Sequence, residues 1–193
     1  MTADDDLEIL PFESVAAWEA WLREHHDTSP GVWLRLAKKG SGVASVSYDE
    51  ALDAALCHGW IDAKKRSFDD TFFLQKFTAR RPRSVWSKRN REKAAKLIEA
   101  GLMRPAGLRQ VELAKADGRW EAAYEGSGGA TVPEDLQREL DRNPAAAGFF
   151  ATLDRTNRYA VLWRVQTAKR PETRARRIER LVQMLAEGRK IHG

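Results

Sequence analysis

The sequence predicts an α+β fold, with a small antiparallel sheet and flanking helices in the N-terminal part and an all-helical C-terminal part. Alternating or continuous apolar runs typical of strands occupy residues 32–38, 60–66 and 71–79, all N-terminal to Arg80. From Ser87 onward, apolar residues recur at helical spacing, and glycine or proline separates the segments. Strands followed by helices, rather than alternating with them, are typical of the α+β class.

Local signals place two helices before the strand pair 60–66 and 71–79. Ser14 is the expected N-cap of a helix over 14–26. Ser47 and Glu50 form a capping-box pattern that starts a second helix, which Gly59 ends. The run 71–79 is apolar on both faces, which predicts a central strand.

Proline and polar residues mark the helices of the C-terminal half. The expected helices run from Ser87 to Ala100, from Pro105 to Asp117, from Pro133, from a Thr156 cap, and from Pro171 to Gly188, and Asn143-Pro144 interrupts the chain before Phe149-Phe150. The glycine-rich stretch after Tyr124 is the best linker, so the predicted organisation is an α+β domain over 1–124, a linker over 125–132 and a helical segment over 133–193.

Composition excludes several classes of protein. The chain has 193 residues, a formal net charge of +5 and a single cysteine, which is incompatible with an internal disulfide framework. No stretch reaches the roughly 20 apolar residues of a membrane helix. The acidic N-terminus lacks the pattern of a signal peptide, so we expect a cytoplasmic protein without a membrane association.

A basic run over residues 76–91 is the strongest functional signal. It contains seven Lys or Arg and no acid, and it passes from a strand end through a proline turn into a helix start. Guanidinium groups and a helix start both attract anions, and Trp86 adds an aromatic plane of the kind that stacks on a base. The alternative is a solvated basic face with Trp86 packed inward.

The helix-to-strand junction over 55–62 carries three groups with possible acid–base or nucleophilic chemistry: Cys57, His58 and Asp62. Adjacent helix positions point about 100° apart, so Cys57 and His58 are poorly placed to form a thiolate–imidazole pair. Cys57 is better explained as a small buried residue. A second basic stretch, over 155–159 and 169–178, would contribute to a site only if it converged with the first.

Other chemistries lack their motifs. The four histidines have no partners at metal-ligand spacing, so no metal is expected. The sequence has no P-loop, no dinucleotide fingerprint and no nucleophile elbow, so no cofactor is expected.

Several motifs together resemble the YdeI/OmpD-associated family, also called bacteriocin-protection. They are Leu56-Cys57-His58-Gly59-Trp60-Ile61-Asp62, Phe77 to Arg81, Trp86-Ser87 with Asn90, Gly101-Leu102-Met103, and the C-terminal stretch from Tyr159 to Ile178. The resemblance extends from Phe12 to Gly188. It implies a bacterial cytoplasmic globular protein and supplies no catalytic residues.

These observations lead to a binding hypothesis, in which the chain holds an anionic ligand such as a nucleotide or phosphorylated metabolite. The expected ligand-binding residues are His58, Trp60, Asp62, Arg80, Arg81, Arg83, Trp86, Ser87, Lys88 and Asn90. The alternatives are an enzyme that uses His58 and Asp62 as base and orienting group, or an interaction module whose basic C-terminal helix binds an acidic protein or nucleic acid. The balance favours a protein that is not an enzyme.

Overall fold

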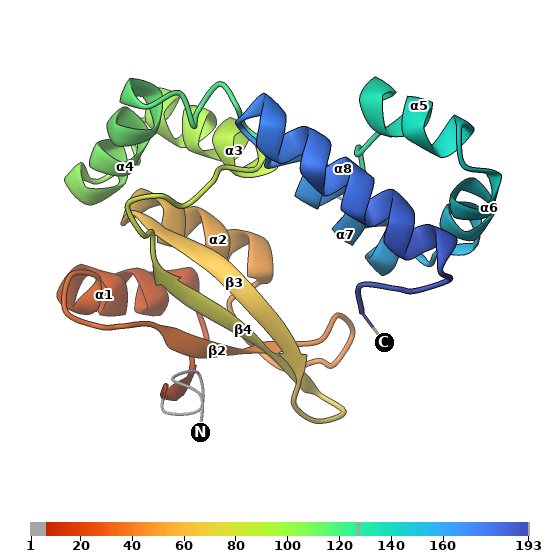
Figure 1. Cartoon of the computed structure of the whole chain (residues 1–193). Helices are drawn as coiled ribbons and strands as arrows, with labels where there is room; N and C mark the ends of the chain where they lie inside the picture. The colour runs from red at the N-terminus through yellow and green to blue at the C-terminus, as the bar shows by residue number, and fades with distance from the viewer. Residues whose placement is uncertain (1–6, 127, 193) are drawn as a thin grey trace. The chain divides into compact units, whose positions relative to one another are not determined.

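The computed structural model describes residues 7–126 and 128–192, and it divides them into two compact units. The N-terminal unit contains the residues up to Trp86 together with Asn90–Ala122, and the C-terminal unit contains Ser87–Arg89 together with the residues from Ala123 onward. The strands lie in the N-terminal unit, and the C-terminal unit is built from helices (Figure 1). The predicted α+β class is confirmed.

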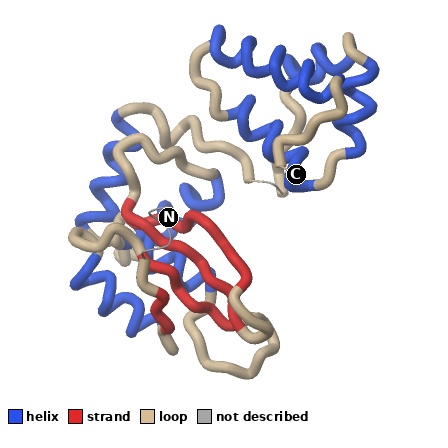
Figure 2. Tube along the Cα trace, turned by 60° about the horizontal axis from the view of Figure 1, so that its bottom comes forward, coloured by secondary structure: helices blue, strands red, loops and turns tan. Residues whose placement is uncertain are grey.

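One four-stranded sheet forms the centre of the N-terminal unit. The strands are β1 (Ile9–Pro11), β2 (Val32–Ala37), β3 (Trp60–Ser67) and β4 (Phe72–Ala79), in the order β1-β2-β4-β3. Figure 2 shows the strands of this sheet side by side. β4 pairs antiparallel with β2 and β3, so it is central, as the apolar character of both its faces predicted. β1 adds a parallel edge strand whose three residues are too short to show alternation in the sequence.

Two capped helices pack on the sheet, namely α1 (Val15–His25) and α2 (Tyr48–Cys57). The Ser14 hydroxyl accepts from the Ala17 N–H at 3.3 Å, and the capping box of Ser47 and Glu50 forms in both directions. Between helices and sheet lies an aromatic core in which Trp18 contacts Trp60 and Phe77 at ring-centre distances of 6.3 and 5.8 Å. Rings at these separations and angles add favourable packing to their large buried area.

The end of α2 is in close backbone contact with the start of α4 (Pro105–Ala116), which follows α3 (Lys88–Glu99). The Arg104 N–H donates to the Cys57 carbonyl at 3.1 Å. A Cβ at Gly107 would lie 2.4 Å from that same carbonyl oxygen. On the other side, Gly59 has φ +76° and passes the Ala106 carbonyl so closely that a Cβ would lie 2.9 Å from its oxygen. Glycine at both positions lets the two helix ends meet.

From Ala123 onward, the described residues of the C-terminal unit form the helices α5 (Glu134–Asp141), α6 (Pro144–Thr152), α7 (Arg155–Gln166) and α8 (Pro171–Ala186). α8 packs against the other three, and Figure 1 shows it crossing in front of α7. Leu136, Phe150, Val161 and Leu185 are among the residues of its apolar core.

The cap of α7 differs from the prediction. Asp154, not Thr156, is the N-cap, and its carboxylate accepts from the Asn157 N–H at 2.8 Å. This carboxylate, two positions before Thr156, satisfies a free backbone N–H group of the first turn, so the helix begins before Thr156.

We predict that Gly107→Ala lowers the free energy of unfolding by about 1–3 kcal/mol, because the added methyl group forces α4 away from the last carbonyls of α2. Urea unfolding followed by far-UV circular dichroism measures the change. Gly148→Ala is the matched control: it lies in α6 with no atom within 4 Å of its added Cβ, and helix propensity predicts a gain of up to about 1 kcal/mol. Equal stability of Gly107→Ala and the wild type would show that the junction is not tight.

Candidate functional site

Two adjoining cavities open at the junction of α2 and α4 in the N-terminal unit. Their volumes are about 300 and 470 Å³, and both are lined by His26, His58, Ala106 and Arg109. The smaller cavity is also lined by Asp27, Gly59, Trp60, Ala79, Arg80 and Gln110, and the larger by Arg23, Arg104 and Pro105. We call the two cavities together the histidine–arginine cleft.

Two histidines form the inner part of this cleft. His58 caps the C-terminus of α2 and is only 6% exposed, and its ring centre lies 5.4 Å from that of His26. The His26 Nδ1 atom lies 3.0 Å from the Leu22 carbonyl oxygen, so a proton on Nδ1 is donated to that oxygen. Trp60 donates its indole N–H to the His26 carbonyl at 2.8 Å and thereby fixes the chain at His26.

Positive charge surrounds the histidines. Arg23, Arg104 and Arg109 are exposed residues from α1 and from the start of α4, and Asp27 is the one acid among the described lining residues. Burial, followed by the charges of His26, Arg104 and Arg23, lowers the pKa of His58 to about 4. His58 is therefore neutral at pH 7, and the positive charge of the cleft resides on the arginines.

Of the ten expected ligand-binding residues, three line this cleft: His58, Trp60 and Arg80. Arg80 is buried, and its guanidinium lies 3.5 Å above the centre of the Trp86 ring. Trp86 is 2% exposed and also packs edge-on against Trp120, while Trp60 is 0% exposed. The fold thus buries the indole rings of Trp60 and Trp86, which we expected to stack on a ligand. Both rings instead support the cleft from within the core.

Asp62 and Asn90 lie at the other end of α2. The Tyr48 hydroxyl, in the first turn of α2, donates to Asp62 Oδ2 at 2.8 Å, and the Asn90 amide donates to Oδ1 at 3.4 Å. Both carboxylate oxygens of Asp62 therefore have hydrogen-bond partners other than His58.

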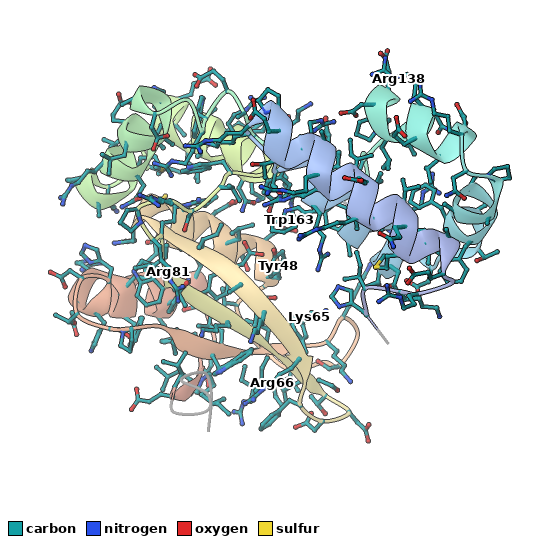
Figure 3. The ribbon with its side chains drawn as sticks, viewed as in Figure 1. Tyr48, Lys65, Arg66, Arg81, Arg138 and Trp163 are labelled. Carbon is teal, nitrogen blue, oxygen red and sulfur yellow. The ribbon has the colours of Figure 1, made fainter. Side chains whose placement is uncertain are left out.

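The other predicted residues lie outside the cleft. Arg81 and Arg83 are exposed in the turn after β4, where the Ser84 hydroxyl accepts from the Arg81 N–H at 3.0 Å (Figure 3 labels Arg81). Ser87 and Lys88 belong to the C-terminal unit. There Ser87 forms a β-bridge with Tyr124, and Lys88 forms an ion pair with Glu125.

The basic residues of α8 have structural contacts within the C-terminal unit. The Arg174 guanidinium makes a two-pronged ion pair with Asp135, with distances of 2.5 and 2.8 Å, and joins α8 to α5. Arg177 donates to the Arg164 carbonyl at 2.8 Å and joins α8 to α7. These contacts explain part of the second basic stretch as packing between helices.

Cys57 lies beside the cleft but is not a nucleophile at neutral pH. The side chain is buried, and burial raises the pKa of the thiol to about 11. A thiol that stays protonated at pH 7 is poorly reactive.

Sequence reasoning missed the other lining residues of the cleft, among them Arg23, His26, Arg104 and Arg109. These four come from α1 and from around the start of α4, and no local pattern connects these segments. The available signal was Gly107, a glycine inside an expected helix, which often marks a close backbone approach. Together with Arg104-Pro105 two residues earlier, that glycine indicates a packed helix start with a cation at its edge.

Within residues 7–126 and 128–192, no group of three or more His, Cys, Asp or Glu side chains is placed to hold a metal ion. Over the same residues, no helix is both long enough and apolar enough to cross a membrane.

The fold and the cleft show that the N-terminal unit is an α+β module with a cationic cavity. Two protein families match parts of the chain. Residues 10–110, more than half of the chain, match the family described as "Domain of unknown function (DUF8412)", so the protein belongs to this family. Residues 129–188 match the family described as "Bacteriocin-protection, YdeI or OmpD-Associated".

The second match confirms the predicted family resemblance, and the motif from Tyr159 to Ile178 lies within it. The motifs between Leu56 and Met103 lie instead within the first match. Comparisons with curated proteins and with solved structures find no match.

The low pKa of His58 predicts that the N-terminal unit loses stability as the pH falls from 6.5 through about 4. The unfolded chain binds a proton on this histidine near pH 6.5 and the folded chain only near pH 4, so stability is complete above 6.5 and declines below it. Between pH 7 and 4.5 this one group contributes a loss of about 2–3 kcal/mol.

Urea unfolding followed by tryptophan fluorescence measures this effect. As the pH falls from 7 to 4.5, the difference in unfolding free energy between the wild type and His58→Gln should shrink by about 2–3 kcal/mol. A difference that stays constant with pH would contradict the buried, neutral state of His58.

Proposed function

We propose that the protein is a binding protein for a small anion, a phosphate- or carboxylate-bearing metabolite, whose charged group occupies the histidine–arginine cleft. The observation that carries the proposal is the convergence of Arg23, Arg104 and Arg109 on cavities that His26 and His58 also line. Guanidinium groups pair with phosphate or carboxylate oxygens through two parallel N–H donors, and they keep their charge at every physiological pH.

The start of α4 adds to the attraction for an anion. Pro105 and Ala106, in the first turn of this twelve-residue helix, line the larger cavity, and Arg104 at the N-cap makes no side-chain capping bond. The positive end of the helix dipole therefore faces the same space as the arginines. The histidine rings add N–H or acceptor atoms whose roles depend on their tautomers.

Binding is favoured over catalysis by the surroundings of the reactive groups. Asp62 is held by Tyr48 and Asn90 at the far end of α2, and the Cys57 thiol is protonated. The Asp62 carboxylate is engaged by residues other than His58, which weighs against the enzymatic alternative. The cleft retains the features of a binding site, which are a concave shape, a buried polar floor and a charged rim.

We predict that inorganic phosphate binds the wild type and that Arg104→Gln/Arg109→Gln weakens this binding by about tenfold or more, since two charge-assisted pairs are lost. Isothermal titration calorimetry measures the dissociation constant, and sodium chloride keeps the ionic strength equal between titrations. Binding that stabilises the folded state should also raise the melting temperature.

Arg81→Gln/Arg83→Gln is the matched control, because it removes the same charge from exposed positions of the same unit outside the cleft. It should bind phosphate as the wild type does. Equal weakening in both double variants would mean that a general positive field attracts the anion, and the absence of phosphate binding to the wild type would refute the proposed site.

A further inference from the structure

We propose that the C-terminal unit holds a second site, which binds an aromatic anion of the mononucleotide type in a cavity along α7. The cavity has a volume of about 580 Å³. Its described lining residues are Tyr124, Arg155, Thr156, Tyr159, Ala160, Trp163, Arg164 and His192, and none of them is an Asp or Glu. They share no residue with the histidine–arginine cleft, so this inference stands apart from the proposed function.

The hollow is formed by two neighbouring rows of side chains on α7. Arg155, Tyr159 and Trp163 follow one another at intervals of four residues and form the first row. Thr156, Ala160 and Arg164 form the second, with the smallest side chain in the middle. Because Ala160 separates two longer side chains, the helix surface is recessed there.

The remaining walls are held in place by hydrogen bonds. Lys88 donates its backbone N–H to the Tyr124 carbonyl at 2.9 Å. The N–H of His192 donates to the side-chain oxygen of Asn157, a buried residue of α7, at 2.9 Å, which brings the end of the chain back onto this helix. The site is thus built from three segments that are distant in sequence.

The cavity combines flat aromatic surface with positive charge. The Tyr124 and Trp163 rings meet edge-on with centres 6.4 Å apart, and Trp163 remains 37% exposed, at the surface of α7 where Figure 3 labels it. The Tyr159 hydroxyl donates to the Glu125 carbonyl at 3.2 Å, and burial raises the pKa of this tyrosine to about 12, so it stays neutral. A base that stacks on Trp163 would leave its phosphate within the field of Arg155 and Arg164.

The guanidinium groups of Arg155 and Arg164 are suited to binding a phosphate. Arg164 donates one N–H to the Ala160 carbonyl at 3.0 Å, which orients a group that carries five N–H donors in total. The acid nearest in sequence to Tyr124, Glu125, is paired with Lys88. The histidine–arginine cleft offers no comparable ring, because its Trp60 is fully buried, so the aromatic part of a ligand distinguishes the two sites.

Fluorescence titration with N-methylanthraniloyl-ADP tests this inference on the full chain. We expect saturable binding that unlabelled ADP reverses and that inorganic pyrophosphate reverses at least tenfold less effectively, because pyrophosphate has no ring to stack. Equal competition by pyrophosphate would overturn the aromatic part of the proposal, and the absence of binding up to about 1 mM probe would overturn the site.

Variants locate the binding. Trp163→Ala should weaken it about tenfold or more, while Trp163→Phe, which keeps an aromatic face, should retain most of the affinity. Ala160→Leu fills the recess and should weaken binding without removing any donor. Arg155→Gln should weaken it, whereas Arg138→Gln, at an exposed arginine of α5 in the same unit, should not (Figure 3).

One variant separates this inference from the proposed function. Arg104→Gln/Arg109→Gln should lose affinity for phosphate and keep its affinity for the labelled nucleotide. If that variant loses the nucleotide while Trp163→Ala and Ala160→Leu keep it, the nucleotide binds in the N-terminal unit and the second site does not exist.

Discussion

The contact between the last carbonyls of α2 and the first turn of α4 is the constraint on which the cleft depends. Gly107 has no side chain to hold the backbones apart, and Gly59 turns the chain through a left-handed conformation beside Ala106. The hydrogen bond from Arg104 to the Cys57 carbonyl then fixes the start of α4 next to His58. A larger residue at either glycine would separate the cations from the histidines and open the cleft.

The buried groups around this contact position the cleft rather than react in it. Trp60 carries its ring into the aromatic core and uses its N–H to hold the backbone of His26. Arg80 covers Trp86, and Trp86 packs on Trp120, so these residues of the basic run stabilise the turn after β4. His58 stays neutral because burial and neighbouring cations disfavour its proton, and a bound anion would offset that cationic field.

Local signals in the sequence predicted most of the elements. Ser14, the capping box of Ser47 and Glu50, and the doubly apolar run of β4 each act through neighbouring residues, and the structure confirms all three. β1 escaped prediction because three residues cannot show a period. Asp154, and not Thr156, caps α7, because both residue types are good N-caps and the sequence offers them two positions apart. The candidate site was harder to predict than the secondary structure. We expected His58, Trp60 and Arg80 in the site, but the arginines that line the cleft with them come from distant segments of the chain.

Backbone amide shifts in a titration of the ¹⁵N-labelled protein with inorganic phosphate test the central claim most directly, since they report on each residue separately. The account predicts that the largest shifts occur at His58, Gly59, Arg104 and Ala106, on both sides of the contact between α2 and α4. Shifts confined to the exposed turn around Arg81 and Arg83, or no shifts at all, would contradict it.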